Sequence, residues 1–286
     1  MTLWAISDLH LGHPRNRDAL DVFVDQADGR FVDDGLILAG DIAESPGRLG
    51  DALDRLGACF RTLLWTPGNH DLWIQAGQPD APRGVAKYQQ MVEVCRARGV
   101  RTPEDPWLRW PRSGRADDPV GDDDPVIALL FLLYDYSFRP AHVTRDGVVA
   151  WSLEEGILCT DEHLLKPDPY PTRDAWCHAR CDDAERRLAA LDGAPTVLVN
   201  HWPLREDVLK LRRVPRFSPW CGTVRTIDWH RRFRAEVAVY GHQHVRGVDR
   251  RDTTRFEEVS FGYPRDWDPA RGLIGYLRPI LPSPRR

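Results

Sequence analysis

Short apolar runs alternate with stretches of helical periodicity at the start of the chain. Three of these runs have the length and composition of buried strands: residues 2–7, 36–39 and 61–65. Between the first two runs, residues 16–26 place apolar side chains on one helical face. The pair Ser45-Pro46 is typical of a helix start and predicts a helix to about residue 59. This order predicts a β-α-β-α-β unit with parallel strands, as in α/β proteins.

The same patterns continue along the rest of the chain. Helical periodicity predicts three more helices, over residues 86–98, 174–191 and 227–233. Apolar runs predict strands over residues 126–133, 197–199 and 237–240, and two further strands are expected near the end of the chain, over residues 246–249 and 255–260. Residues 134–171 are expected to form a loop over one edge of the sheet, and residues 279–286 a tail. Because no internal repeat or flexible linker divides these elements, we expect a single domain over residues 1–286.

Composition and charge argue against several classes of protein. The formal net charge of −4 and the pI near 6.2 give no general attraction to nucleic acid or to anionic membranes. Six cysteines scattered over 286 residues do not predict a disulfide framework. The first predicted strand begins directly after Met1, and no apolar run approaches the ~18–20 residues of a membrane span. We therefore expect a cytoplasmic protein without nucleic-acid or membrane partners.

Polar residues with the chemistry of metal ligands follow five of the predicted strands. They form five short blocks: Asp8-Leu9-His10, Gly40-Asp41, Gly68-Asn69-His70-Asp71, Asn200-His201 and Gly241-His242-Gln243-His244. The carboxyl ends of strands in an open α/β sheet are the usual place for ligand sites. Asp, His and Asn without thiolates suit manganese, iron or zinc and argue against a structural zinc site. We interpret Asp41 as a carboxylate that bridges two divalent ions.

These five blocks, in this order between residues 8 and 244, resemble those of the calcineurin-like metallophosphoesterases. The resemblance implies the metallo-dependent phosphatase fold, a four-layer α/β/β/α sandwich of two mixed sheets. It also implies a phosphoric ester hydrolase with two divalent ions, manganese before iron or zinc, in which a bridging hydroxide attacks phosphorus. By the same resemblance, one ion would be held by Asp8, His10, Asp41 and His244, and the other by Asp41, Asn69, His201 and His242.

The resemblance also implies roles for two residues that do not bind metal. His70 would lie beside the phosphate, where it would stabilise the transition state or protonate the leaving oxygen. Asp71 would orient the imidazole of His70, as carboxylate partners commonly do. No ligand position of the family pattern is empty in this sequence, which argues against a module that has lost its catalytic activity.

Substrate recognition is suggested by the arginine-rich stretch that follows His201. Arginine suits phosphate recognition because it makes bidentate contacts. The candidate substrate-binding residues are His13, Arg205, Arg213, Arg216 and Arg265. For any single one of these arginines, an ordinary solvated basic loop is the alternative interpretation.

Three functions are consistent with the sequence. Residues 102–106, 217–223 and 262–265 resemble actinobacterial members of the family, one of which removes the 4′-phosphopantetheine arm from acyl carrier proteins. The first function is therefore a phosphodiesterase or phosphomonoesterase that acts on a carrier protein or a small molecule. The second is a nuclease or cyclic-nucleotide phosphodiesterase of the same fold, although a nuclease needs a continuous basic track. The third is a non-catalytic interaction module.

Overall fold

The chain folds into two mixed β-sheets that lie face to face. The computed structural model describes residues 1–74, 81–115 and 118–282. The four-stranded sheet has the order β10-β1-β2-β3, with β1 (Leu3–Ile6), β2 (Gly35–Ala39), β3 (Thr62–Thr66) and β10 (Arg278–Leu281). The six-stranded sheet has the order β4-β5-β6-β7-β9-β8, with β4 (Leu108–Arg109), β5 (Val126–Leu129), β6 (Thr196–Val199), β7 (Ala235–Tyr240), β8 (Gly247–Arg251) and β9 (Thr254–Glu258). The central strands of each sheet run parallel, whereas β10, β4 and β8 are antiparallel edge strands.

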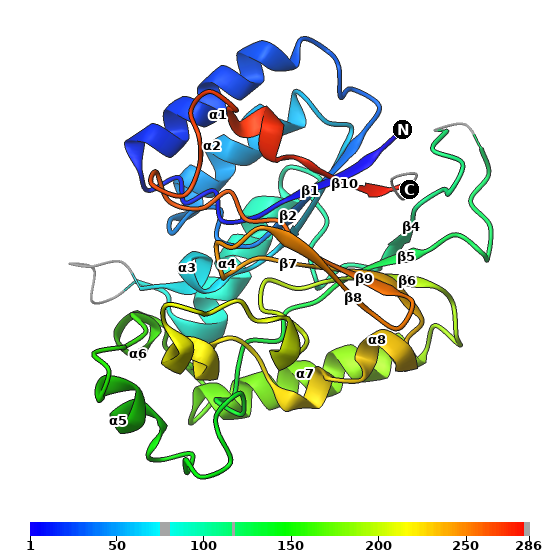
Figure 1. Ribbon diagram of the computed structural model, residues 1–286. Coiled ribbons are helices and arrows are strands. Elements are labelled where there is room, and N and C mark those ends of the chain that lie inside the picture. The colour runs from blue at the N-terminus through cyan, green and yellow to red at the C-terminus, as the bar shows by residue number, and fades with distance from the viewer. Residues whose placement is uncertain (75–80, 116–117, 283–286) are drawn as a thin grey trace.

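Helices cover the outer faces of both sheets (Figure 1). On the side of the four-stranded sheet lie α1 (Pro14–Ala27) and α2 (Pro46–Gly57), and on the side of the six-stranded sheet lie α7 (Arg173–Ala189) and α8 (Trp229–Arg232). The other helices are α3 (Asn69–Leu72), α4 (Gly84–Arg96), α5 (Val148–Leu153) and α6 (Asp161–Leu164), with 3₁₀ turns η1 (Glu206–Val208), η2 (Pro215–Trp220), η3 (Val224–Thr226) and η4 (Leu273–Tyr276). The predicted four-layer α/β/β/α sandwich is therefore confirmed. Among the described residues, no helix combines the length and the apolar character that crossing a bilayer requires.

An apolar layer between the two sheets fixes the positions of the strands. Leu3 and Ile37 from one sheet and Val197 and Val239 from the other belong to this layer, and each is at most 1% exposed. All five residues of β2 are buried, as expected for a parallel strand that is covered on both faces. A slip of one residue would move every side chain of β2 to the opposite face, where it would meet a different apolar cluster, so side-chain packing also fixes the register. The carboxyl ends of the strands therefore have fixed relative positions.

The structure corrects three of the predicted elements. The strand expected over residues 126–133 ends at Leu129, and the chain then turns at Leu133 and Tyr136, which both have positive φ angles. The expected loop over residues 134–171 contains α5 and α6. The first residues of the expected tail, 279–281, belong to β10, because Ile280 and Leu281 bury their side chains and an edge strand tolerates the proline at position 279. Residues 283–286 of that tail lie outside the described residues.

Arg173, at the start of α7, ties the segment around α6 to the rest of the fold. Its guanidinium donates hydrogen bonds to the hydroxyl of Tyr136 at 2.7 Å and to the backbone carbonyls of Asp161 and Leu165 at 2.9 and 3.1 Å. It also forms an ion pair with Glu162, and both side chains are less than a fifth exposed. A buried ion pair of this kind is costly to break, because the remaining charge is left without a partner.

We expect Arg173→Met to lower the free energy of unfolding by about 3 kcal/mol, because Glu162 would lose its buried cation. Urea denaturation followed by circular dichroism would measure the loss. Arg186→Met is the matched control on the same helix, since Arg186 is 73% exposed and, among the residues that the structure describes, forms an ion pair only with Asp183. That control should change stability by less than ~0.5 kcal/mol. Equal effects of the two substitutions would show that the contacts of Arg173 do not hold this segment.

Candidate metal centre

Five strand ends bring the seven predicted metal ligands to one place. The residues concerned are Asp8 and His10 after β1, Asp41 after β2, Asn69 after β3, His201 after β6, and His242 and His244 after β7. Three of these strands belong to one sheet and two to the other, so the residues meet where the carboxyl ends of both sheets come together. All seven are buried or half-buried. The sequence pattern therefore predicted their proximity correctly.

Five of these seven residues have a backbone conformation that side chains with a Cβ rarely adopt. Their φ angles are positive: Asp8 +55°, His10 +43°, Asp41 +56°, His242 +73° and His244 +53°. Such left-handed conformations cost about 1–3 kcal/mol each at constrained sites, and they cluster where function requires them. Here each one turns the chain sharply at a strand end and directs the side chain inward.

Two glycines allow these turns to approach one another. A Cβ on Gly40, which has a φ of +90°, would lie 2.5 Å from Nδ1 of His201. A Cβ on Gly68 would lie 2.1 Å from a carboxylate oxygen of Asp41. Both contacts are too short for any other residue, so the glycines before Asp41 and Asn69 are required by the close packing of the site.

One group of facing donor atoms comes from β1 and β7. Nε2 of His244 lies 3.0 Å from Oδ1 of Asp8 and 3.0 Å from Nε2 of His10. Nε2 of His10 lies 3.7 Å from the same carboxylate oxygen. These three residues form one of the groups whose ligand atoms all lie within 4.8 Å of one another.

A second group joins the two sheets. Oδ1 of Asn69 lies 3.2 Å from Nε2 of His201 and 3.1 Å from Nδ1 of His242. Oδ2 of Asp41 lies 3.4 Å from Nε2 of His201. Ligand atoms of Asp41, His10 and His70 also lie within 4.8 Å of one another. Asp41 is therefore close both to the ligands that follow β1 and to His201.

The donor atoms fit divalent metal ions. Metal–ligand bonds of ~2.0–2.2 Å place neighbouring ligand atoms roughly 3–3.5 Å apart, and all but one of the distances given above lie in this range. The second ring nitrogen of two histidines is also fixed: Nδ1 of His201 faces the carbonyl of Ala39 at 2.9 Å, and Nδ1 of His244 faces Asp266 at 3.1 Å. These partners favour the tautomer that leaves Nε2 free to bind a metal.

Each of the two central carboxylates has one oxygen bound to the protein and one directed to the site. Oδ2 of Asp8 accepts hydrogen bonds from the hydroxyl of Ser260 at 2.8 Å and the backbone N–H of His242 at 3.2 Å. Oδ1 of Asp41 accepts the N–H of His70 at 2.8 Å. The other oxygen of each carboxylate faces the imidazoles described above, so its position is set by the fold.

Burial and charge determine how the site ionises. Burial opposes the ionised form of Asp41, but the nearby His201 and His70 outweigh this effect and hold its pKa below the usual range. Burial lowers the pKa of His10 and of His242 to about 3, so both imidazoles stay neutral. Burial also opposes a charge on His201, but Asp41 and Asp8 raise its pKa to about 9. The site therefore favours added positive charge, and protons compete with metal ions for the same atoms.

Asp71 has a different role from the one predicted. Its carboxylate accepts hydrogen bonds from four backbone N–H groups, at distances of 2.8–3.1 Å, in Asp41, Ile42, Ala43 and Gly68. It therefore joins the turn after β2 to the turn after β3. The ring of His70 is instead paired through Nδ1 with Oε1 of Glu44, at 3.4 Å. The prediction that Asp71 orients His70 is wrong, because its oxygens are occupied by the backbone.

Asp161 is a site residue that the sequence did not reveal. Its Oδ1 accepts hydrogen bonds from Nδ2 of Asn69 at 2.9 Å and from Nε1 of Trp73 at 2.7 Å. The first bond fixes which way the amide of Asn69 points, so that its oxygen faces His201 and His242. Asp161 lies on α6, in a segment expected to be a loop, and no local pattern connects it to Asn69.

The structure separates the five predicted substrate-binding residues. His13 and Arg265 lie beside Tyr263, at the edge of the site. Arg205 is paired with Asp207, and Arg216 with both Glu154 and Glu155, so the prediction that these two bind substrate is not supported. Arg213 is exposed and forms no ion pair with any residue that the structure describes.

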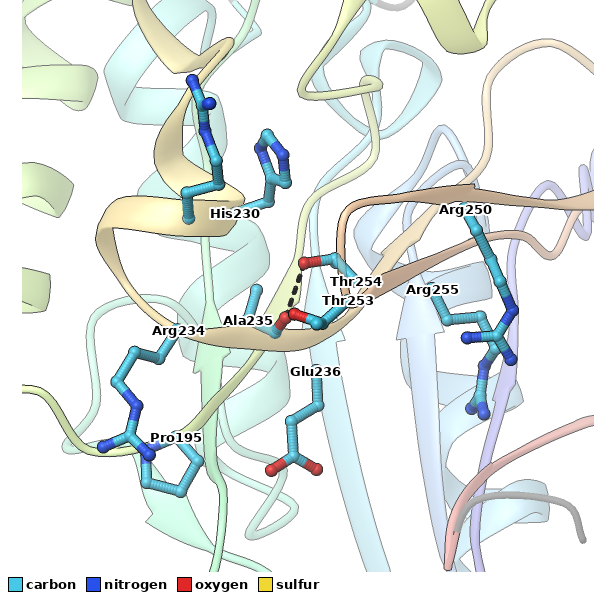
Figure 2. Close-up of a pocket in the computed structure, with 10 residues that line it drawn as sticks. Pro195, His230, Arg234, Ala235, Glu236, Arg250, Thr253, Thr254 and Arg255 are labelled. Atoms are coloured by element: carbon cyan, nitrogen blue, oxygen red, sulfur yellow. Dashed lines mark hydrogen bonds between the residues drawn. The ribbon is translucent and has the colours of Figure 1, made fainter.

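One cavity gives a ligand access to the predicted metal ligands, and a larger one does not. A cavity of about 260 Å³ is lined by four of the predicted metal ligands and by His70. The four ligands are Asp41, Asn69, His242 and His244, and the rest of the lining is Trp73, Leu158, Cys159, Thr160, Phe217, Gln243 and Tyr263. A larger cavity of about 620 Å³ lies at the opposite end of β7, around Ala235 and Glu236 (Figure 2). It is lined by arginines such as Arg234, Arg250 and Arg255 and contains none of the predicted ligands. The smaller cavity is therefore the candidate active site.

We expect Asp161→Ala to weaken binding of Mn²⁺ by about 10- to 100-fold, as is common when the partner of a metal ligand is removed. The affected ion would be the one near Asn69, whose amide would be free to turn. Isothermal titration calorimetry would measure the affinity. Asp161→Asn should restore most of it, because its amide oxygen can still accept both hydrogen bonds. Asp146→Ala removes an exposed carboxylate from the same segment and serves as the control. Unchanged affinity in Asp161→Ala would contradict the assigned role.

Comparison with known proteins agrees with this geometry. The profile of the family described as calcineurin-like phosphoesterase matches residues 1–246. The chain is 44% identical, over 287 aligned residues, to the acyl-carrier-protein phosphodiesterase PptH of Mycobacterium tuberculosis, with 99% of this chain and 84% of that protein covered. The crystal structure of phosphopantetheinyl hydrolase (PptH) from Mycobacterium tuberculosis superposes with a TM-score of 0.87 and 43% identity, over 99% of this chain and 96% of that chain. The chain therefore belongs to the calcineurin-like phosphoesterase family and is a hydrolase of phosphoric esters.

Proposed function

We propose that this phosphoesterase is a phosphodiesterase that releases 4′-phosphopantetheine from acyl carrier proteins. The observation that carries the proposal is the 44% identity, over 99% of the chain, to a protein named as an acyl-carrier-protein phosphodiesterase. We also infer that residues 1–286 form one domain, because a single apolar layer takes side chains from both sheets. A cytoplasmic location accords with the six free, buried cysteines.

We assign the metal ligands by the two groups of facing atoms. Asp8, His10, Asp41 and His244 would hold one divalent ion, and Asp41, Asn69, His201 and His242 the other. Asp41 would bridge them, which is supported by its membership of groups with residues from both sets. Manganese is the first candidate, and iron or zinc would suit the same oxygen and nitrogen donors. When bound, such a pair of ions lowers the pKa of water and neutralises the charge that develops on the phosphate.

His70 is placed to act on the leaving group. It lines the cavity, and its Nε2 lies 4.0 Å from Oδ2 of Asp41. Burial opposes a charge on the imidazole, but Asp41 and Glu44 outweigh burial and raise the pKa of His70 above its usual value. We infer that the ring gives a proton to the leaving oxygen, which for this substrate is an alkoxide that needs protonation.

The walls of the cavity suit a substrate with a long neutral chain. Trp73, Leu158 and Phe217 form its apolar side, and Leu158 is 37% exposed. Phe217 lies 5.8 Å from the ring of His242, between centroids, and follows the exposed residues Arg212 and Arg213. The apolar side would contact the pantetheine arm, and the two arginines would face the acidic surface of a carrier protein.

The other functions suggested by the sequence have less support. A nuclease would need basic residues along a continuous track, but Arg205 and Arg216 near the site are paired with carboxylates. A non-catalytic module is opposed by the completeness of the donor set and by the positive φ angles that its residues maintain.

The direct test is incubation of purified chain, loaded with Mn²⁺, with a phosphopantetheinylated acyl carrier protein. We expect the carrier protein to lose the mass of the arm, and the loss to stop when the metal is removed with EDTA. Mass spectrometry would detect both outcomes. Asp41→Asn should lose more than one of the two metal ions and all detectable activity, because Asp41 is common to both groups. If the wild-type enzyme hydrolyses a chromogenic diester but leaves the carrier protein unchanged, the carrier protein is not its substrate. The assignment to the phosphoesterase family would still hold.

A second prediction concerns the two exposed arginines. Replacement of Arg212 and Arg213 together by alanine should raise KM for the carrier protein by roughly 3- to 10-fold and leave hydrolysis of a small diester unchanged. The effect should shrink as salt concentration rises, because exposed charges act through screened attraction. Arg30 and Arg61, which are exposed and precede β2 and β3, form the control pair. A loss on both substrates would mean that the arginines contact the reacting phosphate instead.

A further inference from the structure

Tyr263 reaches the candidate active site from a part of the chain that the family profile does not cover. The profile ends at residue 246, and Tyr263 follows β9. The backbone before it is fixed to the turn after β1, since the N–H of Gly262 donates to the carbonyl of Asp8 at 3.0 Å. The carbonyl of Gly262 in turn accepts from Nδ2 of Asn16 at 2.9 Å. This segment is therefore built into the site.

The side chain of Tyr263 is held among the histidines of the site. Its ring is stacked on His10, with centroids 4.4 Å apart and an angle of 18°, and its centroid lies 4.7 Å from that of His244 at an angle of 67°. Oδ2 of Asp266 accepts the backbone N–H of Tyr263 at 2.9 Å and faces Nδ1 of His244 at 3.1 Å. The same carboxylate thus positions the tyrosine and one of the predicted metal ligands.

The hydroxyl of Tyr263 contacts the histidine assigned to the leaving group. Its oxygen lies 3.3 Å from Nε2 of His70, whose Nδ1 faces Glu44 at 3.4 Å. The imidazole is therefore held at both nitrogens. Trp73 covers one face of the ring, with centroids 3.5 Å apart. These contacts leave the imidazole little freedom to rotate.

We propose that Tyr263 is a positioning residue for His70 and sets the direction of its Nε2 toward the leaving oxygen. The proposal rests on the proposed role of His70 as a proton donor. A phenolic hydroxyl both donates and accepts hydrogen bonds, so it can hold Nε2 whether or not that nitrogen carries a proton. The hydrogen bond that the single N–H of Nε2 donates passes from the hydroxyl of Tyr263 to the leaving oxygen when the substrate reacts. His10 and His244, two of the predicted metal ligands, hold the ring of Tyr263 in place. The hydroxyl of Tyr263 in turn holds the imidazole of His70, which is not a predicted metal ligand.

The step that depends on this alignment is protonation of the leaving group. The oxygen of water forms a new bond to phosphorus, and the bond from phosphorus to the leaving oxygen breaks. The leaving oxygen takes the proton of Nε2 of His70. A proton from the water, passed through solvent, replaces the one that His70 gives away. Misalignment of Nε2 therefore slows the reaction most for leaving oxygens that need the proton.

The test compares Tyr263→Phe with wild type on a series of small phosphodiesters whose leaving groups range from p-nitrophenol to a simple alcohol. We expect kcat to fall by about 3- to 10-fold on the alkyl ester, the size of one lost hydrogen bond, and by less than about 2-fold on the p-nitrophenyl ester. His70→Ala should lower kcat on the alkyl ester by ~10²–10⁴. Adding Tyr263→Phe to His70→Ala should have no further effect, because the hydroxyl acts through the imidazole.

A second readout does not depend on turnover. The readout is the NMR signal of Nε2 of His70 in Zn²⁺-loaded protein with ¹⁵N-labelled histidine. This signal is assigned by its absence from the spectrum of His70→Ala. It should shift in Tyr263→Phe, while the bound zinc stays equal to that of wild type. Tyr170→Phe is the control, since Tyr170 stacks on Trp176 away from the site.

Three results would overturn the proposal. The first is an equal loss of kcat on all esters together with lost zinc, which would mean that Tyr263 only supports His10 and His244. The second is a double variant, His70→Ala with Tyr263→Phe, whose loss of kcat equals the product of the two single losses. The third is an unshifted Nε2 resonance with unchanged kcat on the alkyl ester. Because all the esters are small diesters, these outcomes can be read even if the carrier protein is not the substrate.

Discussion

Two carboxylates, Asp8 and Asp41, are buried side by side at the ends of neighbouring strands, and the rest of the site follows from this constraint. A buried charge without compensation is strongly unfavourable, so the fold must supply hydrogen bonds to each carboxylate and a cation between them. One oxygen of each carboxylate is bound by the protein, and the other faces the imidazoles. The sheets fix where the carboxylates lie, and metal ions or protons supply the missing positive charge.

The architecture explains why the site is precise although it is built from turns. Parallel strands of two packed sheets deliver five strand ends to one edge, and the apolar layer prevents any strand from slipping. Asp71 then joins two of the turns through four backbone N–H groups, which makes them a single unit. The left-handed residues are stable in this setting because neighbouring contacts determine their conformation. Glu44 and Asp161 orient His70 and Asn69 from outside the group of ligands.

Sequence patterns predicted the parts of the structure that depend on local order and failed where distant segments meet. Apolar runs and the residues after them identified most of the strands and the strand ends that carry the predicted ligands, whereas the two mixed sheets were implied by the family resemblance and β4 and β10 were missed. These patterns could not connect Asp161 with Asn69, or Tyr263 with His70, because the partners in each pair lie far apart in sequence. The family resemblance implied that Asp71 orients His70, but adjacent residues on a helical turn point in different directions, and Asp71 binds backbone N–H groups instead. Sequence also does not show that carboxylates neutralise Arg205 and Arg216, which leaves these two substrate-binding candidates without support.

The C-terminal part of the chain completes both the first sheet and the active site. β10 pairs with β1, and the segment from Ser260 to Asp266 binds the turn that carries Asp8. During synthesis on the ribosome, β1, β2 and β3 emerge more than two hundred residues before β10, so the first sheet has an open edge throughout that time. Asp8 and Asp41 are likewise synthesised early, whereas their partners His201, His244 and Ser260 are synthesised much later. A nascent chain of this protein is therefore exposed to strand pairing with other chains, and to premature capture of metal, until its final segment leaves the ribosome.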